Sequence, residues 1–94
     1  MNNVISPRLR ELKQQSFAEL SRLADYQGER VRMGGKSFTL SVWKDSISDH
    51  EVRVVVQAYR PWVLGIGRMA AQGFVIDRSG AIRDLKNEEL YDFI

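Results

Sequence analysis

The residues best suited to chemistry gather between residues 45 and 51, in the segment DSISDHE. Asp45, Asp49 and Glu51 place three carboxylates beside His50, the only histidine, and oxygen and imidazole ligands of this kind can bind a divalent metal ion. Their spacing matches no established ligand pattern, and neighbouring residues on a loop or strand point in different directions. We therefore interpret the segment as a solvated polar loop and predict neither a metal site nor a catalytic group.

A second segment, GIGRMAA at residues 65–71, has the G-x-G-x-x-A pattern of a dinucleotide-binding turn. That turn functions between a strand and a helix of a βαβ unit, with an acidic residue on the following strand. Only 23 residues follow Ala71 in the 94-residue chain, which leaves no room for such a unit. We predict no bound nucleotide or other cofactor, and interpret the segment as part of a strand.

Composition excludes several further classes of function. Cysteine is absent, which excludes disulfides, thiolate catalysis and cysteine-based zinc sites. The net charge of +2, with 44% hydrophobic and 28% charged residues, is ordinary for a folded domain. No apolar run approaches the roughly 18 residues of a spanning helix, and the N-terminus lacks the apolar core of a signal peptide. We expect one domain over residues 1–94, cytoplasmic and without a membrane partner.

The elements that would position any site begin with a helix. Ser6 is placed as an N-cap and Pro7 as the first helical residue. Apolar residues then recur at the helical period, which predicts one amphipathic helix running to about Tyr26. Gly28 follows as a left-handed C-cap. The residues within one arc of this helix, which form its mainly apolar stripe, are Leu9, Leu12, Ser16, Phe17, Leu20, Leu23 and Ala24.

After Gly28 the period changes to two, which is typical of strands. Short turns between them, including Gly34-Gly35 and DRSG at 77–80, permit only antiparallel pairing. Arg60-Pro61 predicts a further turn, and Asn87 caps a last helical turn. The prediction is an α+β fold with an N-terminal helix packed on a four- to five-stranded antiparallel meander sheet and a short C-terminal helix. The expected strands cover residues 30–33, 38–43, 51–59, 62–77 and 81–85.

Strict alternation assigns the side chains to the two faces of this sheet. The helix side would carry Phe38, Leu40, Val42, Val52, Val54 and Val56, and also the small fourth-strand face of Val63, Gly65, Gly67, Met69 and Ala71. The opposite face is too apolar to be left to water, and exposed patches of this kind usually mark interaction surfaces. This candidate interaction surface consists of Trp43, Arg53, Val55, Tyr59, Leu64, Ile66 and Arg68.

Two binding functions compete for that surface. In the first, two sheets pack face to face in a homodimer, with apolar residues at the centre and arginines at the rim. In the second, single-stranded nucleic acid stacks its bases on Trp43 or Tyr59 while arginines meet the phosphates. Val55, Leu64 and Ile66 offer a base or phosphate no specific contact, so we expect a non-enzymatic protein that self-associates.

Two apolar segments leave an alternative open. Trp62, in the segment YRPW, either folds over the edge of the core, which we favour because tryptophan is usually buried, or projects as a wedge into a partner. The C-terminal NEELYDFI, residues 87–94, either docks on the sheet edge of its own chain, which we favour, or reaches a partner subunit.

Overall fold

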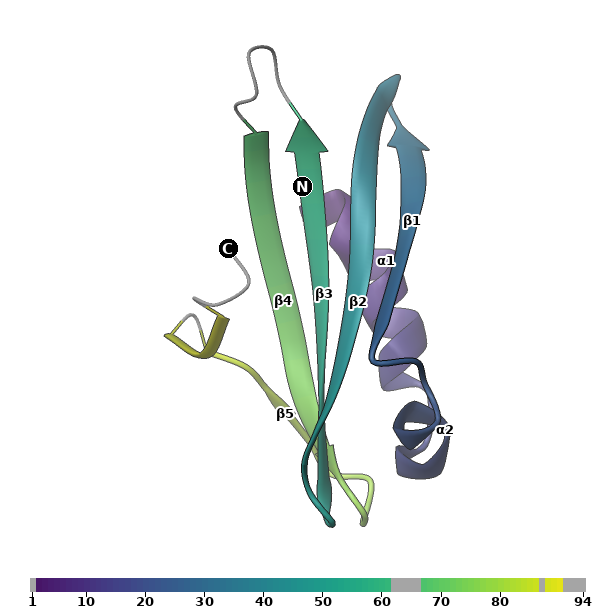
Figure 1. The fold of residues 1–94 in the computed structure, drawn as a ribbon, viewed down its shortest axis with the longest axis vertical. Helices are drawn as coiled ribbons and strands as arrows, with labels where there is room; N and C mark the ends of the chain where they lie inside the picture. The colour runs from purple at the N-terminus through teal and green to yellow at the C-terminus, as the bar shows by residue number, and fades with distance from the viewer. Residues whose placement is uncertain (1, 62–66, 87, 91–94) are drawn as a thin grey trace.

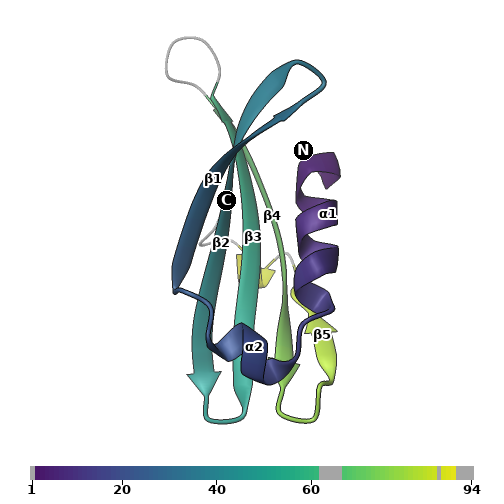
Figure 2. The ribbon, with the colours of Figure 1, turned by 90° about the vertical axis from the view of Figure 1, so that its right-hand side faces the viewer.

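The computed structural model describes residues 2–61, 67–86 and 88–90, with the side chains of 4–60, 69–86 and 88–90. Helices cover one face of a five-stranded antiparallel sheet (Figures 1 and 2), which confirms the predicted α+β class. The strands lie in the order β1-β2-β3-β4-β5, so the sheet is a meander. In chain order the elements are α1 (Asn2–Lys13), α2 (Phe17–Ser21), β1 (Tyr26–Met33), β2 (Lys36–Ser48), β3 (Glu51–Pro61), β4 (Gly67–Asp77) and β5 (Ile82–Asp84).

The helical part differs from the single helix that the apolar stripe predicts. Helix α1 contains both Ser6 and Pro7, so Ser6 is not its N-cap. After Lys13 the helix stops, and α2 begins with a capping box: the Glu19 amide donates to Ser16 Oγ at 3.2 Å and the Ser16 amide donates to Glu19 Oε1 at 3.0 Å. These bonds satisfy amides at the start of α2 and allow the chain to change direction there. The chain is already in β1 at Tyr26, where we predicted the helix to end.

Two predicted turns are confirmed. Gly34 and Gly35 join β1 to β2 with φ values of 60° and 75°, a region that glycine adopts without the steric cost of a side chain. At the opposite end of the sheet, Asp77 Oδ1 accepts hydrogen bonds from the Ser79 amide at 2.9 Å and the Ala81 amide at 3.1 Å. The Asp77 side chain therefore fixes the turn between β4 and β5.

Strands β2 and β3 are longer than predicted. Residues 45–48, which we assigned to a polar loop, continue β2, with a register shift between Ser46 and Ser48. Asp45 lies opposite Arg53, and their side chains form an ion pair of 2.7 Å, so a cross-strand pair holds polar residues within the sheet. Strand β3 likewise continues to Pro61, where we predicted a turn, because a proline is tolerated at the end of a strand. Trp62 lies outside the described residues.

The core lies between the helices and one face of the sheet. Ile5 and Leu12 of α1 and Leu20 of α2 are fully buried there. Along β2, β3 and β4 alternate residues point into this core, as the sequence predicts for β2 and β3. The buried sheet residues are Phe38, Leu40, Val42, Val52, Val54, Val56, Ala58, Phe74 and Ile76.

The C-terminal segment returns to the far edge of the sheet. The Leu85 amide donates to the Gly73 carbonyl at 2.9 Å, and residues 88–90 form a short 3₁₀ turn in which Leu90 is buried. A hollow at the edge of β4 is lined by both leucines, so this part of the segment docks on its own chain, as we favoured. Residues 91–94 and Asn87 lie outside the described residues.

Candidate interaction face

The face of the sheet opposite α1, called here the second face, is turned toward the reader in Figure 1. The antiparallel register arranges its side chains in rows across the strands, because directly paired residues point to the same side. One row contains Tyr26, Trp43 and Val55. From the β1–β2 turn toward the opposite end, the paired residues of β1 to β3 on this face are Arg32, Ser37, Arg30, Thr39, Tyr59, Gly28, Ser41, Gln57, Tyr26, Trp43, Val55, Asp45, Arg53, Ser48 and Glu51.

On β4, the residues that face the helices and those on the second face are the reverse of what we predicted. Ala70 packs against the helix-side core, and Phe74 and Ile76 belong to it, so Met69 and Ala71 are on the second face. The register continues from 67 to 77 without a break. The burial of Phe74 and Ile76 therefore determines which face each described side chain of β4 occupies.

Three members of the candidate interaction surface cannot be placed by their side chains. Leu64 and Ile66 lie outside the described residues, and so does the side chain of Arg68. The other members, Trp43, Arg53, Val55 and Tyr59, are brought together on β2 and β3 of the second face.

Two aromatic rings occupy the middle of the second face. Tyr26 and Trp43 have ring centroids 4.5 Å apart and ring planes tilted by 56°. Tyr26 Oη lies 3.2 Å from Ser41 Oγ, and Trp43 Nε1 donates to Gln57 Oε1 at 3.2 Å. Because the rings remain 49% and 38% exposed while these bonds restrict them, they form a preorganised aromatic platform.

Gly28 explains how the tyrosine lies flat on the strand. We predicted a helix C-cap at this position, but Gly28 is inside β1, opposite Ser41. A Cβ atom on Gly28 would lie 2.6 Å from Tyr26 Oη, so the phenol occupies the space that a side chain would fill. Local alternation could not have revealed this part of β1, because Gln27 and Glu29 share a face with Val31. Sequence reasoning therefore assigned the Tyr26 ring to the helix end.

Val55 is not exposed, although sequence reasoning placed it on an open apolar surface. Its exposed fraction is 1%, and that of Val75 on the neighbouring strand is 3%. The Leu85 side chain lies over Gly73, the residue paired with Val55: a Cβ atom on Gly73 would be 2.9 Å from Leu85 Cδ1. Leu85 therefore covers the β4 side of the second face beside Val55, and the accessible part lies over β1, β2 and β3, joined near the β1–β2 turn by Met69 of β4, which is 44% exposed.

The two ends of this accessible part differ in charge. Toward the β1–β2 turn, Arg30 and Arg32 are exposed, and none of the second-face side chains described beside them is a carboxylate. Beyond the aromatic platform lie Asp45, Glu51 and Arg53. We call these the basic end and the acidic end.

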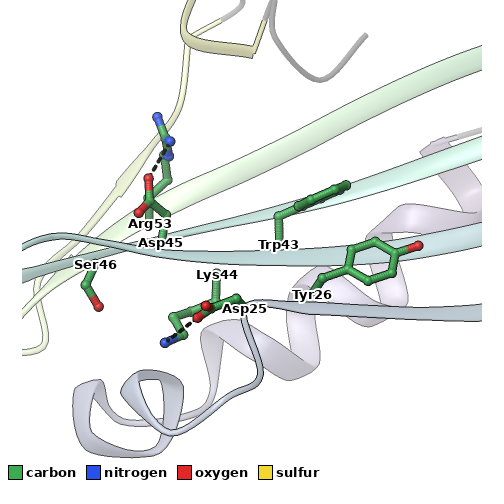
Figure 3. Close-up of a pocket in the computed structure, with 7 residues that line it drawn as sticks. All are labelled: Asp25, Tyr26, Trp43, Lys44, Asp45, Ser46 and Arg53. Atoms are coloured by element: carbon green, nitrogen blue, oxygen red, sulfur yellow. Dashed lines mark hydrogen bonds and ion pairs between the residues drawn. The ribbon is translucent and has the colours of Figure 1, made fainter.

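An open hollow of about 520 Å³ adjoins the platform at the acidic end. It forms where β1 begins at Tyr26 while β2 continues to Ser48, so one edge of β2 has no neighbouring strand there. Figure 3 shows Trp43 and the Arg53–Asp45 pair on one side of β2. The lining residues are Asp25, Tyr26, Trp43, Lys44, Asp45, Ser46 and Arg53.

The segment that could have bound a metal is divided between the sheet and a turn. Asp45 is in β2 and Glu51 begins β3, while Asp49 and His50 form the turn between them. The carbonyls of these turn residues accept hydrogen bonds from Arg78, at 2.6 Å and 3.0 Å. Among the described residues, no group of three or more metal-ligating side chains comes together.

The pKa shifts of the described carboxyl groups arise at turns and caps. The Ser16 amide lowers the pKa of Glu19, and the Ser79 hydroxyl lowers that of Asp77. A hydrogen bond from Arg83 lowers the pKa of Glu89. Each shift stabilises a charged group that holds local structure; Glu19 is exposed, while Asp77 and Glu89 are partly buried.

Comparison with known proteins adds no relative: no protein-family model, curated protein or solved structure matches the chain. In the described residues, neither helix is long and apolar enough to cross a membrane. The second face is therefore the feature of the described residues from which a function can be inferred.

Proposed function

We propose that this protein is a non-enzymatic binding protein that self-associates through the β1–β3 part of its second face. The observation that carries the proposal is the half-exposed Tyr26–Trp43 platform, held in place on a rigid sheet by Ser41 and Gln57. Aromatic residues and arginine are enriched at the centres of protein interfaces, where they contribute much of the binding energy.

The composition around the platform supports the same conclusion. Tyr59 and Met69 extend the apolar surface toward the β1–β2 turn, and Met69 is 44% exposed. Arg30 and Arg32 border it at the edge strand. Few rotatable bonds need to be immobilised when two rigid aromatic platforms meet, so the entropic cost of association at this surface is low.

The size of the surface sets the expected affinity. Five rows of side chains over three strands extend about 27 Å along the strands and about 15 Å across them, which gives a projected area of about 400 Å². Stable interfaces bury about 800 Å² on each partner. We therefore expect a weak dimer, with a dissociation constant on the order of micromolar.

The experiment that tests this proposal is analytical ultracentrifugation over a wide range of protein concentration. The average mass should rise from 10.8 kDa toward twice that value, and Trp43→Ser should shift the transition to higher concentration by at least about tenfold, as expected of an interface hot spot. Ile82→Ser is the matched control, because Ile82 is 41% exposed and lies on the helix side, level with Ile76. A monomer at every concentration would contradict the proposal.

One observation favours the alternative function, binding of single-stranded nucleic acid. Arg30 and Arg32 stand on the same face as Tyr59 and Trp43, and aromatic rings beside cations are typical of surfaces that stack bases and meet phosphates. Titration with an oligonucleotide at low and high salt tests it. Salt-sensitive quenching of tryptophan fluorescence by a protein that stays monomeric would replace self-association with this function.

A further inference from the structure

The charge distribution on the second face defines how two copies fit together, if the proposed self-association is correct. The platform row of Tyr26, Trp43 and Val55 lies near the middle of the accessible part. Arg30 is two rows away in one direction, level with Tyr59, and Asp45 is one row away in the other, level with Arg53. The midpoint between Arg30 and Asp45 falls between the row of Ser41 and the platform row.

We propose that two copies pack face to face about a two-fold axis at the level of this midpoint. The axis lies between the two sheets, parallel to them and perpendicular to the strands, so that the strands of the two copies run in opposite directions. This rotation places the basic end of each copy on the acidic end of the other. The alternative two-fold arrangement, with strands running in the same direction, would place Arg30 and Arg32 of both copies at the same end of the interface, and like charges at an interface cost affinity and suppress wrong arrangements.

The same rotation gives Arg30 a specific site on the second copy. Arg30 lies on β1, and the rotation carries it to the continuation of β1 beyond Tyr26, at the level of Asp45. No strand occupies that position, because β1 begins at Tyr26; the open hollow of about 520 Å³ is there instead. Arg30 of each copy therefore enters the hollow of the other, beside the aromatic platform.

The hollow contains suitable acceptors for a guanidinium group. The Asp45 side chain is 59% exposed although one of its oxygens accepts from Arg53 at 2.7 Å, and an ionised carboxylate has lone pairs for more than one donor. Asp25, at the rim, is 92% exposed while paired with Lys44. A guanidinium can also stack on a neighbouring aromatic ring, which Tyr26 and Trp43 provide.

Charge exchange tests this arrangement. Arg30→Glu would face Asp45 of the other copy and Asp45→Arg would face Arg30, so each variant alone should weaken its dimer by about tenfold for each of the two equivalent contacts. In an equimolar mixture, Glu at position 30 meets Arg at position 45, while the second contact remains native, so the mixed dimer should regain most of the wild-type affinity. Arg10→Glu is the control, because it makes the same charge change at an exposed position on α1.

The orientation of the two copies can be measured separately. The chain contains no cysteine, so Ser37→Cys provides a single site for a spin label. Ser37 is about 17 Å from the proposed axis along the strand direction, which predicts about 34 Å between the two labelled positions, whereas copies with parallel strands would bring them within about 10 Å. A short distance would overturn the proposed arrangement.

The outcomes separate this inference from the proposed function. If wild type dimerises and Trp43→Ser dissociates it, but Arg30→Glu is no weaker than Arg10→Glu, self-association through the second face stands and this arrangement is wrong. If wild type is monomeric at all concentrations, both are wrong. Loss of dimer in both single variants, recovery in their mixture and the long distance between labels would support the arrangement.

Discussion

A substitution at Gly73 tests whether Leu85 and β3 pack closely against β4 on one side of the second face. A Cβ atom there would lie 2.5 Å from the Val54 carbonyl oxygen, 3.1 Å from Val55 Cα and 2.9 Å from Leu85 Cδ1. The first two contacts are with backbone atoms of the neighbouring strand, which cannot rotate away. Overpacking of this kind typically costs about 1–3 kcal/mol.

The expected effect of Gly73→Ala includes one opposing contribution. Alanine reduces the conformational entropy of the unfolded chain, which stabilises the folded state by about 0.4–1 kcal/mol. The net loss should therefore be about 1–2 kcal/mol of unfolding free energy, measured by urea denaturation. For a domain of this size that corresponds to a fall in Tm of about 5–15 °C.

Gly28→Ala is the matched control, since it makes the same substitution in another strand of the same sheet. Its Cβ would meet only Tyr26, at 2.6 Å from Oη, and a phenol ring that is half exposed can move. We expect a change within about 0.5 kcal/mol, because the entropic gain offsets the disturbed ring. Equal losses for the two variants would refute the close approach of Leu85 and β3 to Gly73.

Three further predictions concern the framework that supports the second face. Leu20→Ala should lower the unfolding free energy by about 2–5 kcal/mol, because Leu20 is fully buried; a loss near that of an exposed leucine would show that α2 is not docked. Ser16→Ala should cost about 1 kcal/mol and abolish the capping box with Glu19, which helix-region hydrogen exchange would detect as faster amide exchange. The lowered pKa of Asp77 means that its contribution is present at neutral pH and is lost as the pH falls below about 4. Asp77→Asn should therefore reduce the decrease in Tm on acidification, and an unchanged pH profile would contradict the role of this carboxylate.

The order of the strands and the Gly34-Gly35 and 77–80 turns could be predicted from the sequence because local signals agree with the fold there. Val52, Val54 and Val56 alternate with their neighbours, and Gly34-Gly35 favours a tight hairpin. The same agreement predicts an antiparallel meander without any long-range information. Alternation on β2 and β3 then assigns Trp43 and Tyr59 correctly to the face away from the helices.

The interrupted helix was harder to predict because two signals conflict. The apolar stripe continues through Leu12, Phe17 and Leu20 as if the helix were unbroken, while Ser16 and Glu19 have the spacing of a capping box. In the fold the capping hydrogen bonds prevail, because α2 can then place Leu20 in the core across the end of the sheet. Periodicity alone carries no information about such a change of direction.

The phase of β4 and the burial of Val55 depend on long-range contacts. Small and apolar residues occur on both faces of β4 near Met69, so alternation gives no preferred side until Phe74 is fixed in the core. Val55 is buried through a chain segment thirty residues further on, where Leu85 packs over Gly73. Neither contact can be inferred from the sequence next to the residues whose burial it determines.

Sedimentation equilibrium of the wild-type protein shows whether two copies of the chain associate, as the proposed contact between second faces requires. We predict a concentration-dependent mass that rises from 10.8 kDa toward a limit of twice that value, with a midpoint on the order of micromolar. A mass that remains at 10.8 kDa up to millimolar concentration would contradict self-association.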